Sequence, residues 1–267
     1  MACAGLPTPS ASWWPSSSDD ATMARDLQAE AILSLLRRTA CSLPADVTAA
    51  LEVALAAAPA GPSRLLLGQA LRNGRQAEAE GLPLCEDRGR PVFFVADEAM
   101  AAAVERAARR ARAEGWTGGP SFLARASAIP RGCVGVLVQG RSPRRAARCV
   151  PIPRDADDGA LARAVARAVS RARRLLCPPL FVGVGLGSTR AEARLAALQA
   201  LLSPADAPPS CGLEEELLAA ARAAAGDLPV LALCVAGERT GAAYLAVEFM
   251  CRSARRGLAA LPPPGGS

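Results

Sequence analysis

The core of this chain has to be built almost entirely from aliphatic side chains. Hydrophobic residues make up 51% of its 267 residues, but aromatic residues contribute only 3%. Alanine and leucine therefore do most of the packing, and both are strong helix formers. A chain of this length forms one large domain or two modest ones and can bury a sizeable core. The composition therefore favours a fold rich in helices.

The basic residues limit the kinds of catalytic and metal-binding site that the chain can form. All 31 of them are arginine, because the sequence contains neither lysine nor histidine, and 25 acidic residues leave a net charge of +6. Without histidine, the chain alone cannot form a Ser-His-Asp triad, a Cys-His protease pair or a histidine-ligated zinc site. Any metal must be held by thiolates or carboxylates. The interspersed acids and scarce aromatic residues argue against an arginine-rich nucleic-acid binder.

The two ends of the chain and its cysteines indicate in which cellular compartment the protein is expected. Residues 1–23 are rich in Ser, Pro, Ala and Asp and are expected to form a disordered arm, and residues 261–267 a loose tail. The start lacks the pattern of a signal peptide, and no apolar run approaches the ~18–20 residues that span a bilayer. The nine cysteines include no Cys-x-x-Cys pair. We therefore expect a cytoplasmic protein without a membrane partner.

Helical and strand-like patterns follow one another along residues 24–260, which we interpret as one domain. Helices come first and are then mixed with strands, an order typical of α+β folds. The sequence predicts an N-terminal helical layer packed on a mixed sheet. The expected helices cover residues 24–39, 45–58, 63–80, 97–114, 157–176, 190–202 and 213–225, and the expected strands cover 91–96, 133–139, 181–184 and 228–235.

Three cysteines differ from the others in their surroundings. Cys85, Cys177 and Cys251 each lie at the end of a predicted element, in a loop with Pro, Gly or charged residues beside them. Loops on a rigid scaffold often carry functional residues, although the spacing of these three is a weak signal by itself. The remaining cysteines are interpreted as small buried hydrophobic residues. They are Cys3, Cys41, Cys133, Cys149, Cys211 and Cys234.

The sequences around these three cysteines resemble a known family. Residues 83–89, Pro-Leu-Cys-Glu-Asp-Arg-Gly, are similar to the Pro-Leu-Cys-Gln-Asp-Thr-Gly motif of class I (iron–sulfur) fumarate hydratases and L-tartrate dehydratases. Residues 177–187, Cys-Pro-Pro followed by Val-Gly-Val-Gly-Leu-Gly, resemble the family's second cysteine motif. Cys251 and the Arg-Arg pair that follows it resemble the third. The resemblance is to the α subunit, or N-terminal domain, and covers most of residues 24–257.

The resemblance implies a cofactor and a reaction. The family's three cysteines hold a [4Fe–4S] cluster, so Cys85, Cys177 and Cys251 would be the metal ligands here. The open iron of such a cluster acts as a Lewis acid on the hydroxyl group of a 2-hydroxy dicarboxylic acid of the malate or tartrate type. The resemblance therefore implies a hydro-lyase.

Three other positions match family residues that act on the substrate. Asp87 matches the motif aspartate that works in proton transfer. Arg125, in an Arg-x-Ser stretch, resembles an arginine that pairs with a substrate carboxylate, a task for which a planar guanidinium is suited. Glu86 stands where the family has glutamine and would contact the substrate.

The chain also departs from the family pattern. Arg88 replaces a threonine, and residues 138–148 stand in place of a Lys-Gly-Gly-Gly-Ser-Glu stretch. The family histidine before the third cysteine is missing. The glycines at 185–187 lack the full Gly-x-Gly-x-x-Gly pattern, which argues against a nucleotide site. Two functions stay open: an active hydro-lyase, and a catalytically degenerate paralogue that serves as a cluster-bearing or structural subunit.

The resemblance also implies partners. The chain is too short to include the family's C-terminal β part. An active enzyme would therefore need a separate β subunit, and such αβ units are expected to form a homo-oligomer. Its small-molecule partner would be a dicarboxylic acid.

Overall fold

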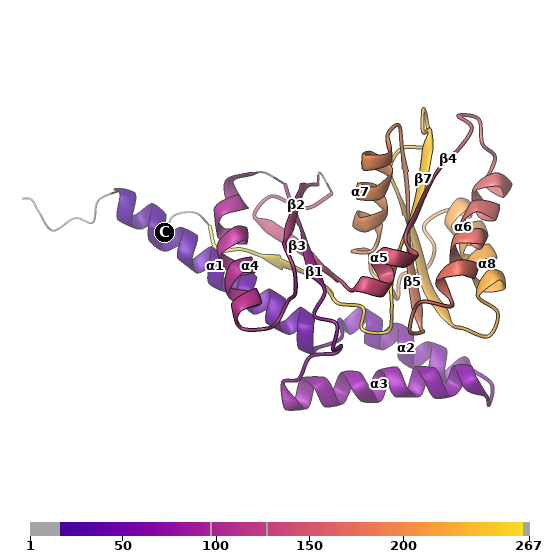
Figure 1. Ribbon diagram of the computed structural model, residues 1–267, viewed down its shortest axis with the longest axis horizontal. Helices are drawn as coiled ribbons and strands as arrows, with labels where there is room; N and C mark the ends of the chain where they lie inside the picture. Colours follow the sequence, from indigo (N-terminus) through magenta and orange to yellow (C-terminus); the bar gives the residue numbers. More distant parts are fainter. Residues whose placement is uncertain (1–16, 97, 127, 264–267) are drawn as a thin grey trace, which may run out of the picture.

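The structure of the chain is a computed structural model that describes residues 17–96, 98–126 and 128–263. Helices and strands follow one another in a mixed order (Figure 1). The helices are α1 (Ser17–Cys41), α2 (Ala45–Ala57), α3 (Pro62–Glu80), the 3-10 helix η1 (Glu98–Met100), α4 (Ala101–Ala113), α5 (Arg141–Ala146), α6 (Asp158–Ala172), α7 (Arg190–Ala200) and α8 (Gly212–Ala225). The strands are β1 (Arg90–Val95), β2 (Phe122–Arg125), β3 (Cys133–Gln139), β4 (Arg148–Pro151), β5 (Leu180–Gly187), β6 (Val230–Ala236), β7 (Tyr244–Met250) and β8 (Arg256–Ala260).

These strands form two four-stranded sheets. The first has the order β2-β1-β3-β8 and the second the order β4-β7-β5-β6. In the first sheet β1 is parallel to β2 and antiparallel to β3, and in the second β5 is parallel to β6 and antiparallel to β7. Both sheets are therefore mixed, and the predicted α+β class is confirmed. The strands divide between two mixed sheets, a division that the sequence pattern did not indicate.

The first sheet is buried on both faces, as its strand β1 shows. Phe93 and Val95 pack with α1 and α4 on one face. Val92 and Phe94 point to the other face and pack with α2, α3 and side chains of the second sheet. Because side chains alternate between the faces of a strand, only a strand covered on both sides is apolar at every position. The uninterrupted Val-Phe-Phe-Val run follows from this arrangement.

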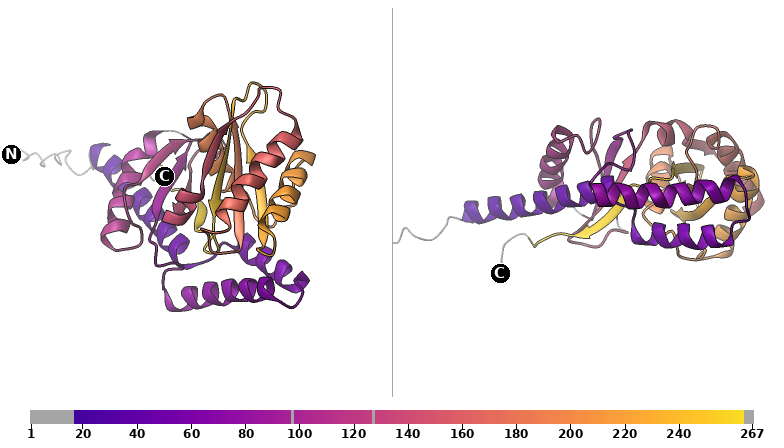
Figure 2. Two further views of the ribbon diagram at one scale, coloured as in Figure 1. Left: turned by 45° about the vertical axis from the view of Figure 1, so that its right-hand side comes forward. Right: turned by 90° about the horizontal axis from the view of Figure 1, so that it is seen from below.

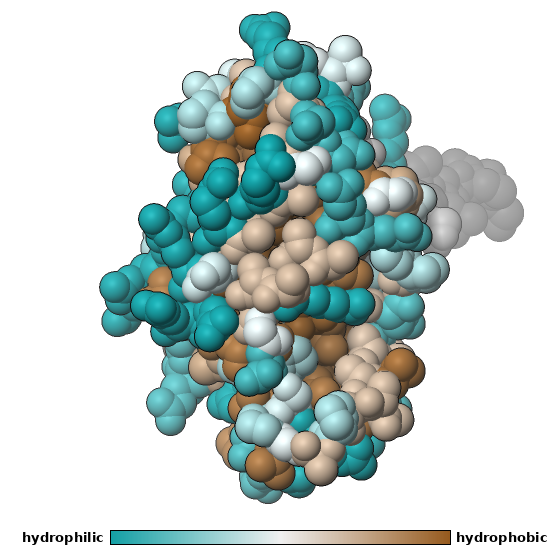
Figure 3. All heavy atoms as spheres, turned by 90° about the vertical axis from the view of Figure 1, so that its right-hand side faces the viewer, coloured by the Kyte–Doolittle hydropathy of each residue, from teal (hydrophilic) through white to brown (hydrophobic). Residues whose placement is uncertain are grey.

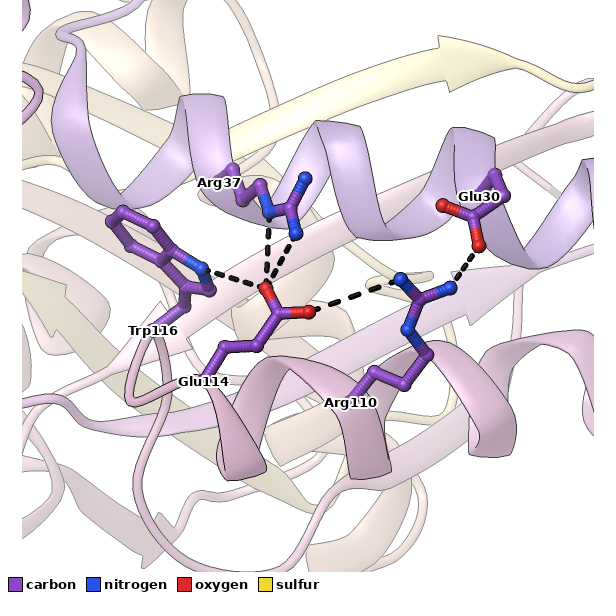
Figure 4. A network of polar contacts seen from close by, with 5 residues as sticks. All are labelled: Glu30, Arg37, Arg110, Glu114 and Trp116. Atoms are coloured by element: carbon purple, nitrogen blue, oxygen red, sulfur yellow. Dashed lines mark hydrogen bonds and ion pairs between the residues drawn. The ribbon is translucent and has the colours of Figure 1, made fainter.

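Helices α1 and α4 cover the outer face of the first sheet. A polar network joins them on the outside (Figure 4): Glu114 accepts hydrogen bonds from Arg37 (2.5 Å) and from Nε1 of Trp116 (3.1 Å), and Arg110 pairs with Glu30. Exposed ion pairs of this kind add little stability, so the aliphatic side chains underneath hold the helices in place. Those of α1 that are buried are Ile32, Leu33, Leu35 and Leu36.

The second sheet lies between α7 on one face and α6 with α8 on the other (Figure 1). The surface on the α6 and α8 side mixes hydrophilic side chains with patches of apolar ones (Figure 3). On the α7 side, Gly183 and Gly185 of β5 lie directly under the helix, and a Cβ at either position would clash with main-chain atoms of Ala197 or Ala193. The glycine-rich run after the second cysteine therefore allows a helix to approach a strand closely.

Helices α2 and α3 form an antiparallel pair beneath both sheets (Figures 1 and 2). Val47 and Leu51 of α2 and Leu67 and Leu71 of α3 contribute to the core that also contains Phe94. This pair forms part of the predicted N-terminal helical layer, whose first helix, α1, packs on the first sheet instead. The pair connects directly to the first cysteine loop through the end of α3.

The predicted boundaries need two adjustments. Helix α1 begins at Ser17, so the arm expected at 1–23 is helical over 17–23, and the rest of it lies outside the described residues. The first two residues of the expected tail are hydrogen-bonded to the rest of the protein. The N–H of Leu261 donates to the carbonyl oxygen of Gly132 (2.7 Å), and the carbonyl oxygen of Pro262 accepts from Gln28 (2.9 Å).

One segment, Asp26–Ala57, is long and apolar enough to cross a membrane by length and composition alone, with a mean hydropathy of 1.4. In the structure it is divided between α1 and α2 by a break before Ala45. Both helices contribute aliphatic side chains to the core, although 22% of the window is buried and Leu27 and Val53 are exposed.

Candidate active site

The first cysteine loop is fixed between α1, α3 and the start of β1. Gly81 ends α3 in the left-handed conformation (φ +63°), and the main-chain N–H of Leu84 donates to the carbonyl oxygen of Ala40 in α1 (2.8 Å). Cys85 follows and is half-buried, whereas Glu86 is exposed. The loop therefore presents its thiol near the surface from a backbone held at both ends.

Asp87 ties this loop to the start of α5. Its Oδ1 accepts a hydrogen bond from the main-chain N–H of Gly89 (3.0 Å), and its Oδ2 accepts one from the N–H of Arg141. A Cβ at position 140 would lie 2.9 Å from Oδ2, so Gly140 permits the contact. Burial alone would raise the pKa of Asp87, but the two hydrogen bonds and the charges of Arg255 and Arg141 outweigh it and lower the pKa. Asp87 is thus a carboxylate at neutral pH.

The second and third cysteine loops meet at one end of the second sheet. Cys177 precedes β5 and Cys251 follows β7, and these antiparallel neighbours pair Phe181 with Met250. The main-chain N–H of Arg252 donates to the carbonyl oxygen of Cys177 (3.1 Å). Cys177 is exposed and Cys251 is half-buried. The strand pairing therefore brings together two cysteines that are far apart in the sequence.

A tight turn follows the third cysteine. The N–H of Ala254 donates to the carbonyl oxygen of Cys251 (2.8 Å), and the Sγ of Cys251 lies 3.6 Å from the Oγ of Ser253. Ala254 has a φ of +35° and is the one non-glycine residue with positive φ among those the structure describes. Left-handed backbone costs a non-glycine residue roughly 1–2 kcal/mol, and such strain is concentrated at functional sites. The turn leads the chain from β7 of the second sheet into β8 of the first.

Arg255 lies directly after this turn and joins the first and third cysteine loops. Its side chain is 3% exposed, and its Nη1 donates to the carbonyl oxygen of Arg88 (3.2 Å). Burial lowers the pKa of Arg255, whereas the nearby groups of Cys85, Cys251 and Asp87 raise it. The sequence marked Arg255 only as part of a motif. Its place beside two cysteines and the aspartate became visible only in the folded chain.

Arg125, in contrast, lies away from these groups. Strand register pairs it with Val95 at the end of β1, whereas the first cysteine loop leads into the start of β1 at Arg90. At about 3.3 Å per residue, the two ends of β1 are about 17 Å apart. The structure therefore brings Cys85 and Asp87 together at one end of the first sheet and leaves Arg125 at the other.

A buried carboxylate lies behind the site and was missed from the sequence. Glu248 is 1% exposed, and its oxygens contact Nε of Arg194 (3.1 Å) and Nε2 of Gln139 (3.3 Å). Burial raises the pKa of Glu248, although Arg194 and Gln139 oppose the shift. Gln139 lies two residues before Arg141, whose main-chain N–H donates to Asp87. The signal in the sequence was a single acid inside the apolar run of β7.

Of the other described cysteines, Cys41 alone is fully buried as predicted. Cys41 is buried, and burial raises the pKa of its thiol. Burial also raises the pKa of Cys149 and Cys234, which are half-buried, as is Cys133. The prediction of a buried position is wrong for Cys211, which is exposed at the residue before α8. Cys3 lies outside the described residues.

The described residues do not form a ready site for a single metal ion. Among the described residues, no three side chains of His, Cys, Asp or Glu lie close enough together to hold a single ion. Cysteines that bind separate irons of a cluster are farther apart than ligands that share one ion. The Cys85 and Cys251 loops lie beside the buried Arg255, and the Cys177 loop is hydrogen-bonded to the Cys251 loop, so the residues present could supply three thiolates to such a cluster.

A family model described as fumarate hydratase (Fumerase) matches residues 29–122 and 150–259, which is most of the chain. The chain belongs to the fumarate hydratase family. The resemblance found in the sequence is thereby confirmed, and at family level the chain is a fumarate hydratase-like hydro-lyase. All three cysteine loops, Asp87 and Arg255 lie within the matched residues, whereas Arg125 and Gly140 lie in the unmatched stretch between them. No curated protein matches the chain.

Proposed function

We propose that this fumarate hydratase-family chain is the cluster-bearing α-type subunit of a hydro-lyase that adds water to, or removes it from, a 2-hydroxy dicarboxylic acid of the malate or tartrate type. The observation that supports the proposal is the link between the three cysteine loops: Arg255, just after the Cys251 turn, donates to Arg88 in the Cys85 loop, and Arg252 donates to Cys177. These thiolates would hold a [4Fe–4S] cluster, which when bound supplies a Lewis-acidic iron that polarises the carbon–oxygen bond of the hydroxyl group.

Asp87 is the proton-transfer group in this proposal. It lies two residues from Cys85 and is ionised at neutral pH because backbone N–H groups and arginine charges lower its pKa. An ionised carboxylate can take the proton from the carbon next to the hydroxyl-bearing carbon during dehydration and return it during hydration. Both of its oxygens already accept main-chain hydrogen bonds, which hold the carboxylate in one orientation.

The substrate and the partner subunit would approach from the exposed side of the site. Cys177, Glu86 and Arg88 are all exposed. Arg88 can attract a dianionic substrate, and Glu86 would contact it. A β subunit is proposed to close this side and to supply the groups that the chain lacks, with αβ units forming a homo-oligomer. Exposed thiolates of this kind favour a reducing, cytoplasmic location.

The second candidate function is a cluster-bearing subunit without turnover. The observation in its favour is that residues 123–149, which carry Gly140 and the start of α5 beside Asp87, fall outside the family match. In that case the three cysteines would bind iron and sulfide, and Asp87 would serve only to hold the loop.

The deciding experiment has two stages. The chain is first reconstituted anaerobically with iron and sulfide, and both are assayed together with the visible spectrum; about four of each per chain are expected. A folded chain that holds no iron would overturn both functions. The loaded chain is then combined with a β subunit and assayed with malate, fumarate and tartrate. Turnover supports the hydro-lyase, and a stable cluster without turnover supports the second candidate.

A further inference from the structure

The guanidinium of Arg255 is a buried cation without a complete set of partners. It is 3% exposed, its Nε has no hydrogen-bond partner, and within the described chain no carboxylate oxygen lies within ion-pair distance of it. Its Nη1 donates a hydrogen bond to the carbonyl oxygen of Arg88, which carries no net charge. Burying an unpaired charge is costly. An anion placed beside Arg255 would therefore be stabilising.

The next residue shows how this chain satisfies a buried arginine when the role is structural. Arg256 is 8% exposed, pairs with the carboxylate of Asp46 and donates to the carbonyl oxygen of Leu202 (3.1 Å). Asp46 in turn accepts from the N–H of Ala205 (2.7 Å). Two adjacent arginines thus differ in one respect: Arg256 has a carboxylate partner, and Arg255 has not.

The groups that surround Arg255 identify the missing anion. Its guanidinium contacts the first cysteine loop at the carbonyl oxygen of Arg88 (3.2 Å), three residues after Cys85, and its backbone directly follows the turn that begins at Cys251. Gly89 leaves space for the guanidinium of Arg255, because a Cβ at position 89 would lie 2.9 Å from its Nη2. Cysteines bind metal as thiolates, so the site gains negative charge next to Arg255 when it is loaded.

We propose that Arg255 is the counter-cation of the cluster site: a positioning residue whose charge compensates the thiolates of Cys85 and Cys251 and so favours loading and raises the reduction potential of the bound group. The inference rests on the proposed cluster site. It assigns the residue no contact with substrate. It also explains why Arg255 lacks a carboxylate partner although the adjacent Arg256 has one.

The test compares Arg255→Gln, which removes the charge, with Arg255→Lys, which keeps it, in the full chain. After anaerobic reconstitution, Arg255→Gln should retain iron at least tenfold less tightly against a chelator, and Arg255→Lys should stay close to the wild type. In the loaded fraction, the reduction equilibrium of Arg255→Gln should shift about tenfold toward the oxidised form, a potential about 59 mV lower for one electron. Arg256→Gln is the matched control, which should lower thermal stability without moving the potential.

Thermal unfolding of the iron-free chains adds a readout that a purely structural role would not give. Because Arg255 is unpaired without the cluster, Arg255→Gln should leave the iron-free chain as stable or make it more stable, while it makes the loaded chain less stable. Equal iron affinity and potential in wild type and Arg255→Gln would overturn the inference, as would equal losses in Arg255→Gln and Arg255→Lys. Failure of the wild-type chain to load would instead overturn the proposed function.

Discussion

The main-chain N–H of Arg252 donates to the carbonyl oxygen of Cys177 across 3.1 Å, so the second and third cysteine loops are joined by their backbones. This bond lies just beyond the last β5–β7 pair, Phe181 with Met250, and joins the two loops that precede β5 and follow β7. The relative position of the two loops is therefore set by strand register. A shift of register would separate the two cysteines.

Replacing Cys177 by serine should abolish cluster assembly, because two thiolates hold a cluster poorly. Iron and sulfide per chain after reconstitution measure the effect, and the expected value falls from about four to well below one. Cys211→Ser is the matched control, because Cys211 is also exposed but lies at the start of α8. Equal iron in both variants would refute the ligand assignment.

Replacing Asp87 by asparagine should lower turnover by about 10²–10⁴-fold, because it removes the proton-transfer group, while the iron content stays unchanged. It should also destabilise the fold by about 1 kcal/mol, since a carboxylate accepts main-chain hydrogen bonds more strongly than an amide does. The folded pKa of Asp87 is lowered, so this stability difference is present above its usual pKa of 3.8 and disappears as the pH falls through the folded value. Urea unfolding at several pH values measures it. A difference that does not change with pH would contradict the assignment.

Replacing Glu248 by glutamine should make the chain relatively more stable as the pH rises. Burial raises the pKa of Glu248 above its usual 4.5, so the protonated form suits the fold and ionisation costs stability as the pH rises through the folded value. Glutamine is neutral at every pH. The advantage of the variant over the wild type should therefore be larger at pH 8 than at pH 4 in urea unfolding. The opposite trend would mean that the ion pair with Arg194 dominates.

Replacing Gly185 by alanine should destabilise the chain by about 1–3 kcal/mol, the usual range for overpacking, because the new Cβ would press on the backbone of α7. Gly212→Ala, in the first turn of α8, is the control, since a Cβ there meets no atom within 4 Å. That variant should be neutral or slightly stabilising. Thermal unfolding compares the two, and equal melting temperatures would disprove the close packing of α7 on β5.

Replacing Arg125 by alanine should leave KM within about threefold of the wild type, a change below 1 kcal/mol, because β1 separates this residue from Asp87. Steady-state kinetics of the loaded enzyme with its β subunit measure the effect. Arg88→Ala, next to Asp87, serves for comparison and should raise KM. A large rise in KM for Arg125→Ala would restore the role that the Arg-x-Ser resemblance implied.

The parts of the site that could be predicted are those encoded in consecutive residues. Residues 83–89 identify a cysteine loop by themselves, because the turn, the thiol and the carboxylate all lie in one short stretch. The position of Arg125 at the far end of β1 could not be predicted, because a local pattern does not state which end of a strand a residue occupies. The site role of Arg255 could not be predicted either, since it depends on β8 returning to the first sheet.

The same distinction applies to the fold. The helices of the N-terminal layer follow from their apolar periodicity, and β1 follows from its continuous apolar run. The division into two sheets could not be read from the sequence, because it depends on long-range pairings such as β3 with β8. The short strands β2 and β4 lack a run long enough to stand out.

The three cysteines of the proposed site come from two different sheets. Cys85 leads into the first sheet, whereas Cys177 and Cys251 border the second. Before the two sheets pack together, at most two of the three thiols lie close to each other. Cluster loading would therefore require a chain in which both sheets are folded and packed, and loss of iron would weaken the packing between the two sheets.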